Sequence, residues 1–159
     1  MTGIVGGIIA AIIMFLLYRH FAGSAGVAFD RNDPLLLAAK QEARDSLPAF
    51  WAALEAGDPA DEEFSLKFNL LHGTGSANNE SIWAGDISRR DGRIFGKLMN
   101  QPVSPGFTHG QEIEIAPDAI DDWSYWRNAV AQGHYVTRLM IEAAPAGAAR
   151  YQKKALGWA

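Results

Sequence analysis

The sequence of 159 residues contains no cysteine. Disulfide bonds, thiolate metal sites and cysteine nucleophiles are therefore excluded, although the absence of cysteine selects no cellular compartment. Basic residues are also in the minority, since 14 Lys and Arg stand against 18 Asp and Glu and give a net charge of −4. Broad nucleic-acid binding needs a basic surface that neutralises phosphates, so we expect no nucleic-acid partner.

Motifs that identify a catalytic or cofactor site are absent as well. The four histidines do not have the spacing of a metal site, and no serine lies in a Gly-X-Ser-X-Gly setting. The two glycines of His72–Asn79 are not followed by the Lys-Ser/Thr pair of a phosphate-binding loop. We therefore expect no catalytic site, no metal site and no cofactor.

The first long feature that is present is an uncharged apolar run, Gly3–Leu17. With Tyr18 it amounts to about 24 Å of helix, near the lower limit for crossing a bilayer. We expect a transmembrane anchor at residues 1–20, inserted through residues 3–18, and a linker at residues 21–32. The alternative is a cleaved secretory signal, for which the small residues of Ala22–Gly26 offer a cleavage site.

The same run predicts a location and a mode of association. Arg19 and Arg31 follow it, so the charge bias predicts a single-pass protein of the bacterial inner membrane with its domain in the cytoplasm. A periplasmic domain is the alternative. Gly3, Gly7 and Ala11 recur every four residues, a pattern that favours a dimer formed through close helix packing.

The remainder predicts one α+β domain over residues 33–142, followed by a flexible basic tail at residues 143–159. Asp33-Pro34 begins a helix with apolar residues at helical spacing, which Pro48 is expected to kink or restart before Gly57 ends it. Short alternating runs follow, up to a last strand at residues 134–141. We expect a kinked amphipathic helix on a curved antiparallel sheet of about five strands, with barrel-like closure of the sheet as an alternative to an open one.

The stretch Ile120–Arg138 concentrates aromatic and charged side chains and is the centre of the predicted binding surface. The candidate residues are Trp83, Asp121, Asp122, Trp123, Tyr125, His134, Tyr135 and Arg138. Arg138 lies among apolar residues, so burial would require a partner, and we expect a salt bridge to Asp121 or Asp122. The alternative is a groove in which Arg138 and the aromatic residues bind an anionic or peptide ligand.

Two classes of function remain open. The first is a membrane-anchored binding or scaffolding module with an unknown protein or peptide partner. The second is a small hydrolase that uses His134 with a nearby carboxylate as an acid–base pair.

An ordered set of short segments resembles a known family over about two thirds of the chain. The segments are Phe50-Trp51, Phe64–Lys67, Glu80–Trp83, Gly96–Pro102, Gly110 before Ile113, Ile120–Tyr125 and Gly133–Arg138. They resemble the YegJ-like family, a bacterial domain of unknown function (2314). The resemblance implies a compact α+β domain, often behind a membrane or export segment, and no established activity. Ser81 stands where that family often carries His, so no role that needs an imidazole is carried over to this position.

Overall fold

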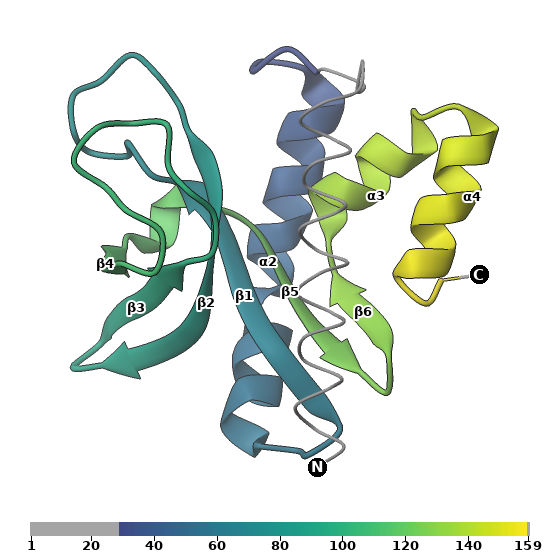
Figure 1. Ribbon diagram of the computed structural model, residues 1–159, viewed down its shortest axis with the longest axis horizontal. Coiled ribbons are helices and arrows are strands. Elements are labelled where there is room, and N and C mark those ends of the chain that lie inside the picture. The colour runs from purple at the N-terminus through teal and green to yellow at the C-terminus, as the bar shows by residue number, and fades with distance from the viewer. Residues whose placement is uncertain (1–28, 159) are drawn as a thin grey trace.

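The computed structural model describes residues 29–158, which form three α-helices and one open sheet of six antiparallel strands. The strand order is β4-β3-β2-β1-β5-β6 (Figure 1). The predicted α+β class is correct, whereas the possible barrel is wrong, because β4 and β6 are the two edges and do not pair with each other. The sheet also has six strands where about five were predicted.

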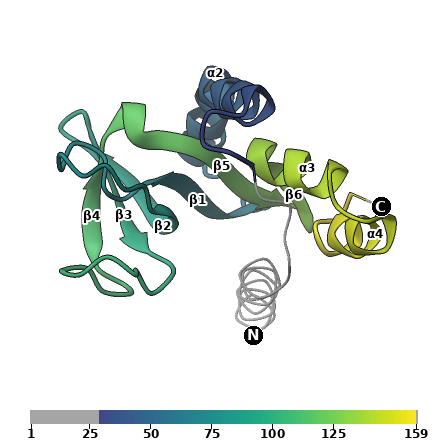
Figure 2. The same ribbon diagram turned by 90° about the horizontal axis from the view of Figure 1, so that it is seen from above.

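Helix α2, Pro34–Ala56, covers one face of the sheet (Figure 2). The Asp33 side chain accepts a hydrogen bond from the Leu35 amide at 2.8 Å, as expected of a capping residue, and Gly57 ends the helix in the left-handed conformation. The helix does not restart at Pro48, which lies inside one continuous element of 23 residues. The indole of Trp123 donates to the Ala43 carbonyl and the Ser46 hydroxyl, both at 3.0 Å, so this part of α2 is held by the sheet.

The strands β1 to β4 form the half of the sheet that precedes the η1 turn, Pro117–Ala119. Their bounds are Asp61–Asn69 for β1, Ser81–Arg90 for β2, Arg93–Leu98 for β3 and Glu112–Ile115 for β4. Each of these strands contributes buried apolar side chains, among them Leu66, Ile82, Ile94 and Ile115. Together with the buried face of α2 they form the larger of two apolar cores.

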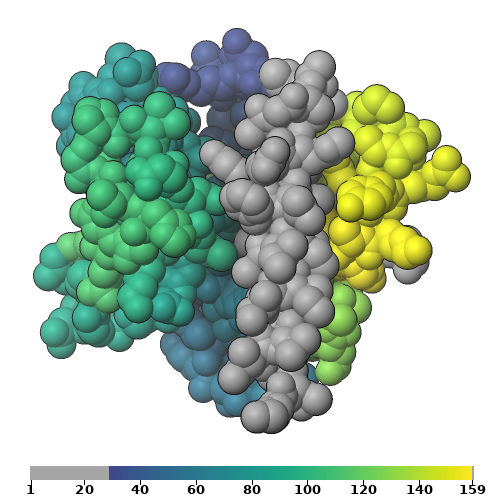
Figure 3. Space-filling model, viewed as in Figure 1, coloured from purple at the N-terminus to yellow at the C-terminus, as the bar shows by residue number. Residues whose placement is uncertain are grey.

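Strand β5, Ile120–Arg127, crosses between this core and the C-terminal part of the domain. Its partner β6 is short, Val130–Gly133, and pairs Trp126 with Ala131. The second, smaller core lies here and consists of Trp126, Ala131, Ile141 and Leu156. The space-filling view places the yellow C-terminal helices and the teal and green strands on opposite sides of the molecule (Figure 3).

The predicted last strand, residues 134–141, is wrong: the chain forms helix α3, Tyr135–Glu142. Gly133 and His134 both adopt positive φ angles, of 75° and 59°, which end the strand and turn the chain. The predicted flexible tail is wrong too, since Ala146–Ala155 form helix α4, and Gln152 and Leu156 are buried. The run Tyr135–Glu142 was misread because a short apolar run has no unambiguous period.

Within residues 29–158, no helix is long and apolar enough to cross a membrane. This finding corrects the prediction of a single-pass protein in the bacterial inner membrane. The predicted anchor at residues 1–20, with its Gly3, Gly7 and Ala11 stripe, lies outside the described residues.

Candidate functional site

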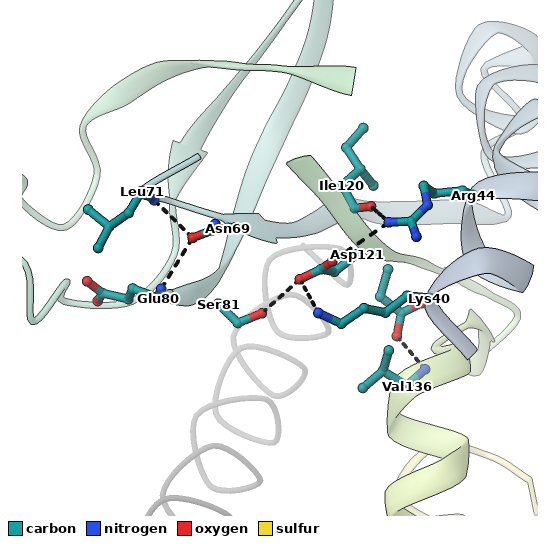
Figure 4. Close-up of polar contacts among 10 residues, drawn as sticks. Lys40, Arg44, Asn69, Leu71, Glu80, Ser81, Ile120, Asp121 and Val136 are labelled. Carbon is teal, nitrogen blue, oxygen red and sulfur yellow. Dashed lines mark hydrogen bonds and ion pairs between the residues drawn. The ribbon is translucent and has the colours of Figure 1, made fainter. Parts of the chain in front are cut away.

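Asp121 lies at an irregularity where β5 slips in register against β1, between the pairs Lys67–Asp122 and Phe68–Ile120. Its carboxylate accepts a hydrogen bond from Lys40 Nζ at 3.0 Å and lies 3.9 Å from Arg44 Nη1 (Figure 4). The Ser81 hydroxyl donates a longer contact at 3.5 Å to the same carboxylate. Asp121 therefore joins β5 with α2 and, through Ser81, with β2.

Asp122 is fully buried and holds the beginning of helix α3. Its carboxylate accepts hydrogen bonds from the amides of Trp123 at 2.9 Å, Tyr135 at 3.0 Å and Val136 at 2.9 Å. Burial raises the pKa of Asp122 to about 6, against the opposing effect of these amides and of the Lys67 charge. The two adjacent carboxylates thus serve two different helices, as side chains of consecutive strand residues point apart.

His134 lies between two indole rings, with ring-centre distances of 5.4 Å to Trp83 and 6.1 Å to Trp158. Its Nδ1 is 3.3 Å from the Thr137 hydroxyl, and its Nε2 is buried without a hydrogen-bond partner among the described residues. Burial, together with the charges of Lys67 and Arg138, lowers the pKa of His134 to about 3. The alternative hydrolase needs His134 hydrogen-bonded to a carboxylate, and in the described part of the chain its ring bonds only to Thr137.

Arg138 does not form the predicted salt bridge with Asp121 or Asp122. Its Nε donates to the Gly133 carbonyl at 2.8 Å, and its guanidinium lies 4.2 Å from the centre of the Trp158 ring. The expectation failed because it placed Arg138 on a strand beside β5. As a helical residue on α3 it points away from both carboxylates, which already have other partners.

The eight predicted surface residues do not form one surface. Trp123 and Tyr125 belong to the larger core beneath α2, where their rings stack at 5.9 Å. Trp83 and His134 form a separate pair whose neighbours are Lys67 and Trp158. Only three of the eight, Trp123, Tyr135 and Arg138, line a common depression.

That depression is a groove of about 600 Å³ between α2 and α3, here called the α2–α3 groove. One wall is Leu35, Ala38, Ala39 and Glu42 of α2 and the other is Tyr135, Arg138, Leu139 and Glu142 of α3, with Trp123, Gln132 and Gly133 also lining it. Both walls follow the spacing i, i+3, i+4, i+7, which places four side chains on one helical face. The α2 stripe is visible in the sequence, whereas the α3 stripe was missed because residues 134–141 were predicted as a strand.

Glu80, the first residue of one of the resembling segments, binds the loop between β3 and β4. Its carboxylate accepts hydrogen bonds from the amides of Val103 at 2.7 Å and Ser104 at 2.9 Å. Burial acts to raise the pKa of Glu80, but these bonds and that of the Ser104 hydroxyl outweigh it and lower the pKa. Glu80 therefore anchors the loop between β3 and β4. Neither Glu80 nor this loop contributes a residue to the lining of the α2–α3 groove.

Among residues 29–158, no three His, Asp or Glu side chains gather closely enough to hold a metal ion. The groove offers both space and several converging side chains.

A comparison with family models matches residues 33–158 to the family described as an uncharacterized protein conserved in bacteria (DUF2314). No curated protein and no solved structure matches the chain. The family match confirms the domain-of-unknown-function part of the resemblance, without testing the YegJ-like name. Because the match covers most of the 159 residues, the chain belongs to the bacterial DUF2314 family.

Proposed function

We propose that this domain is a binding module that holds a peptide segment of a partner protein in the α2–α3 groove. The observation that carries the proposal is the pair of facing helical stripes with open space between them. A volume of about 600 Å³ falls within the range of about 300 to 1,000 Å³ that is usual for ligand sites. An amphipathic helix or extended segment inserted between two helices is a recurrent mode of peptide recognition.

The lining combines apolar and polar side chains, as a groove for a peptide with both kinds of side chain would. Leu35, which lines the groove, is 61% exposed and offers apolar surface to a ligand. Ala38, Ala39 and Leu139 add further apolar surface, and the rings of Trp123 and Tyr135 lie edge to face, 5.7 Å apart. Such aromatic and aliphatic groups are the anchors on which protein interfaces depend.

Both walls are fixed before any partner binds. Trp123 bonds to the Ala43 carbonyl and thereby ties α2 to β5. Asp122 accepts the first two amides of α3 and ties that helix to the same strand. A pre-formed groove lowers the ordering cost of binding, so a short segment can be held with useful affinity.

A random peptide library displayed on phage, selected against the full-length chain, tests the proposal. Ala38 is an exposed residue of one wall, so the larger side chain of the variant Ala38→Phe fills the groove. Ala52→Phe makes the same change at an exposed position of α2 outside the groove. We expect selected peptides to lose binding to Ala38→Phe and to keep it with Ala52→Phe. Absence of enriched peptides, or equal loss in both variants, contradicts the proposal.

A further inference from the structure

We infer that the α2–α3 groove selects a cationic peptide, whose apolar residues face the groove and whose Lys or Arg residues flank them. The inference rests on the proposed function and specifies the partner that the groove fits. It is carried by two acidic side chains, Glu42 and Glu142, that line the groove from opposite helices.

Both carboxylates are available to a partner. Glu42 and Glu142 are exposed residues, and neither forms an ion pair or a side-chain hydrogen bond with any other residue between 29 and 158. Other acidic residues of the sheet, such as Asp61, Glu112 and Glu114, are paired with arginines. The groove therefore holds two acidic side chains that lie beside apolar residues and form no ion pair with a described residue.

The cations near the groove interact with groups other than Glu42 and Glu142. Lys40 and Arg44, on the same helix as Glu42, are directed at Asp121. Arg138 is the one cation among the lining residues, and its guanidinium is held between the Gly133 carbonyl and the Trp158 ring. None of these cations forms an ion pair with Glu42 or Glu142, so the lining carries two acidic side chains against the single positive charge of Arg138, and a partner that brings its own positive charge is favoured.

The apolar part of the groove sets the second requirement. Leu35, Ala38, Ala39 and Leu139 cannot interact favourably with a purely ionic ligand, so charge alone is insufficient for binding. A segment with a leucine-like side chain between basic residues matches both features. Exposed ion pairs contribute modestly, so we expect charge to alter affinity by about tenfold between attractive and repulsive partners.

Three synthetic peptides of about three helical turns test this inference with the full-length chain. They share one apolar frame and carry Lys, Gln or Glu at the flanking positions, and their dissociation constants are measured by fluorescence anisotropy. We expect the order Lys, Gln, Glu from tightest to weakest, with about tenfold between the extremes at low salt and less at high salt. Equal affinities, or the reverse order, overturn the cationic preference, and the reverse order assigns the selection to Arg138 instead.

Charge variants separate the groove from the net charge of the protein. Glu42→Gln combined with Glu142→Gln is expected to abolish the difference between the Lys and Gln peptides while the Gln peptide still binds. The control removes two exposed acids elsewhere, Glu62→Gln with Asp91→Asn, and is expected to retain the difference. Loss of the difference in the control pair overturns the inference, because the net charge would then be the cause.

The same experiment separates failure of the inference from failure of the proposed function. If Ala38→Phe abolishes binding of all three peptides but their affinities are equal, the peptide groove stands and only the cationic preference is overturned. If none of the peptides binds and the phage library gives no groove-dependent peptide, the proposed function fails and the inference fails with it.

Discussion

The two sides of strand β5 are stabilised in different ways. On the α2 side, buried aliphatic and aromatic residues such as Phe50, Leu66 and Ile120 pack into one large apolar core. On the C-terminal side, the buried apolar core has only four residues, and buried polar groups, among them Asp122, His134 and Gln152, lie around it. The first region depends on apolar area removed from water, whereas the second depends on particular hydrogen bonds and backbone angles.

This difference matters because the groove has one wall in each region. Helix α2 is part of the large core, and α3 is held by a carboxylate and by a tight turn at Gly133. Single substitutions in the C-terminal region are therefore expected to lower the free energy of unfolding by more than the small apolar area that they remove would predict. Three substitutions test that expectation.

The largest expected effect is that of Gly133→Ala. A Cβ atom at this position would overlap the carbonyl oxygen and the indole ring of Trp123, and the φ angle of 75° disfavours any side chain. We expect the free energy of unfolding to fall by about 4 kcal/mol or more, or the domain not to fold. Urea denaturation measures the change.

The control for this substitution is Gly92→Ala, where φ is also 75° and no atom lies within 4 Å of the added Cβ. It isolates the backbone strain, which costs about 1 kcal/mol. If the two variants lose the same stability, the close approach of Trp123 to Gly133 is unimportant and the comparison between the regions fails.

The second effect is that of Asp122→Ala, which removes the acceptor of three buried amides. We expect a loss of about 3 kcal/mol in the free energy of unfolding, and a smaller loss for Asp122→Asn, which keeps one acceptor oxygen. Hydrogen exchange adds a local test, since the amides of Tyr135 and Val136 should lose protection. Asp45→Ala, at an exposed residue of α2, should change stability by less than about 0.5 kcal/mol.

The smallest effect is one of pH and concerns His134→Asn, since asparagine tolerates the positive φ angle of this position. Burial lowers the pKa of His134 from 6.5 to about 3, so the unfolded chain takes up a proton first as the pH falls. The contribution of the neutral His134 imidazole to the free energy of unfolding is therefore fully present above pH 6.5. It is lost progressively down to about pH 3, with a loss of about 2 kcal/mol at pH 5. Asp122 acts in the opposite sense, because its raised pKa makes the folded state lose stability as the pH rises toward 6.

Denaturation at pH 7.5 and pH 5 measures the His134 contribution. The change in stability between the two pH values should differ by about 2 kcal/mol between the wild type and His134→Asn. His109→Asn, at an exposed histidine in the loop before β4, is the matched control. If both variants show the same dependence on pH as the wild type, the buried neutral imidazole is not a source of acid sensitivity.

The two regions also differ in how far the sequence predicts them. Helix α2 follows from Asp33-Pro34 and Gly57, and the strands β1 to β4 follow from alternation and the Asp91-Gly92 turn. These signals are local, since each element shows its period and its end within its own residues. The number of strands and the open edges were not predictable in the same way, because they depend on pairing between distant segments.

The secondary structure of the C-terminal region was predicted wrongly because it depends on contacts between residues that are distant in the sequence. Helix α3, Tyr135–Glu142, begins with amides that donate to Asp122, 13 residues before Tyr135, and this contact cannot be seen in the residues of the helix itself. Because residues 134–141 were predicted as a strand, the expected salt bridge of Arg138 was wrong as well. The prediction that Trp123 and Tyr125 are surface residues was also wrong. Three of the predicted residues, Trp123, Tyr135 and Arg138, nevertheless line the α2–α3 groove.

The segment after α4 has a consequence for association between copies of the protein. Ala131 of the edge strand β6 donates its amide to the Leu156 carbonyl at 3.0 Å, and its own carbonyl accepts from the Trp158 indole at 2.8 Å. The outward hydrogen-bonding groups at the centre of this short edge are therefore occupied by the chain itself. A free strand edge is a template on which another chain can add a strand. By occupying the backbone groups of Ala131, Leu156 and Trp158 disfavour such strand addition, and hence aggregation, along β6.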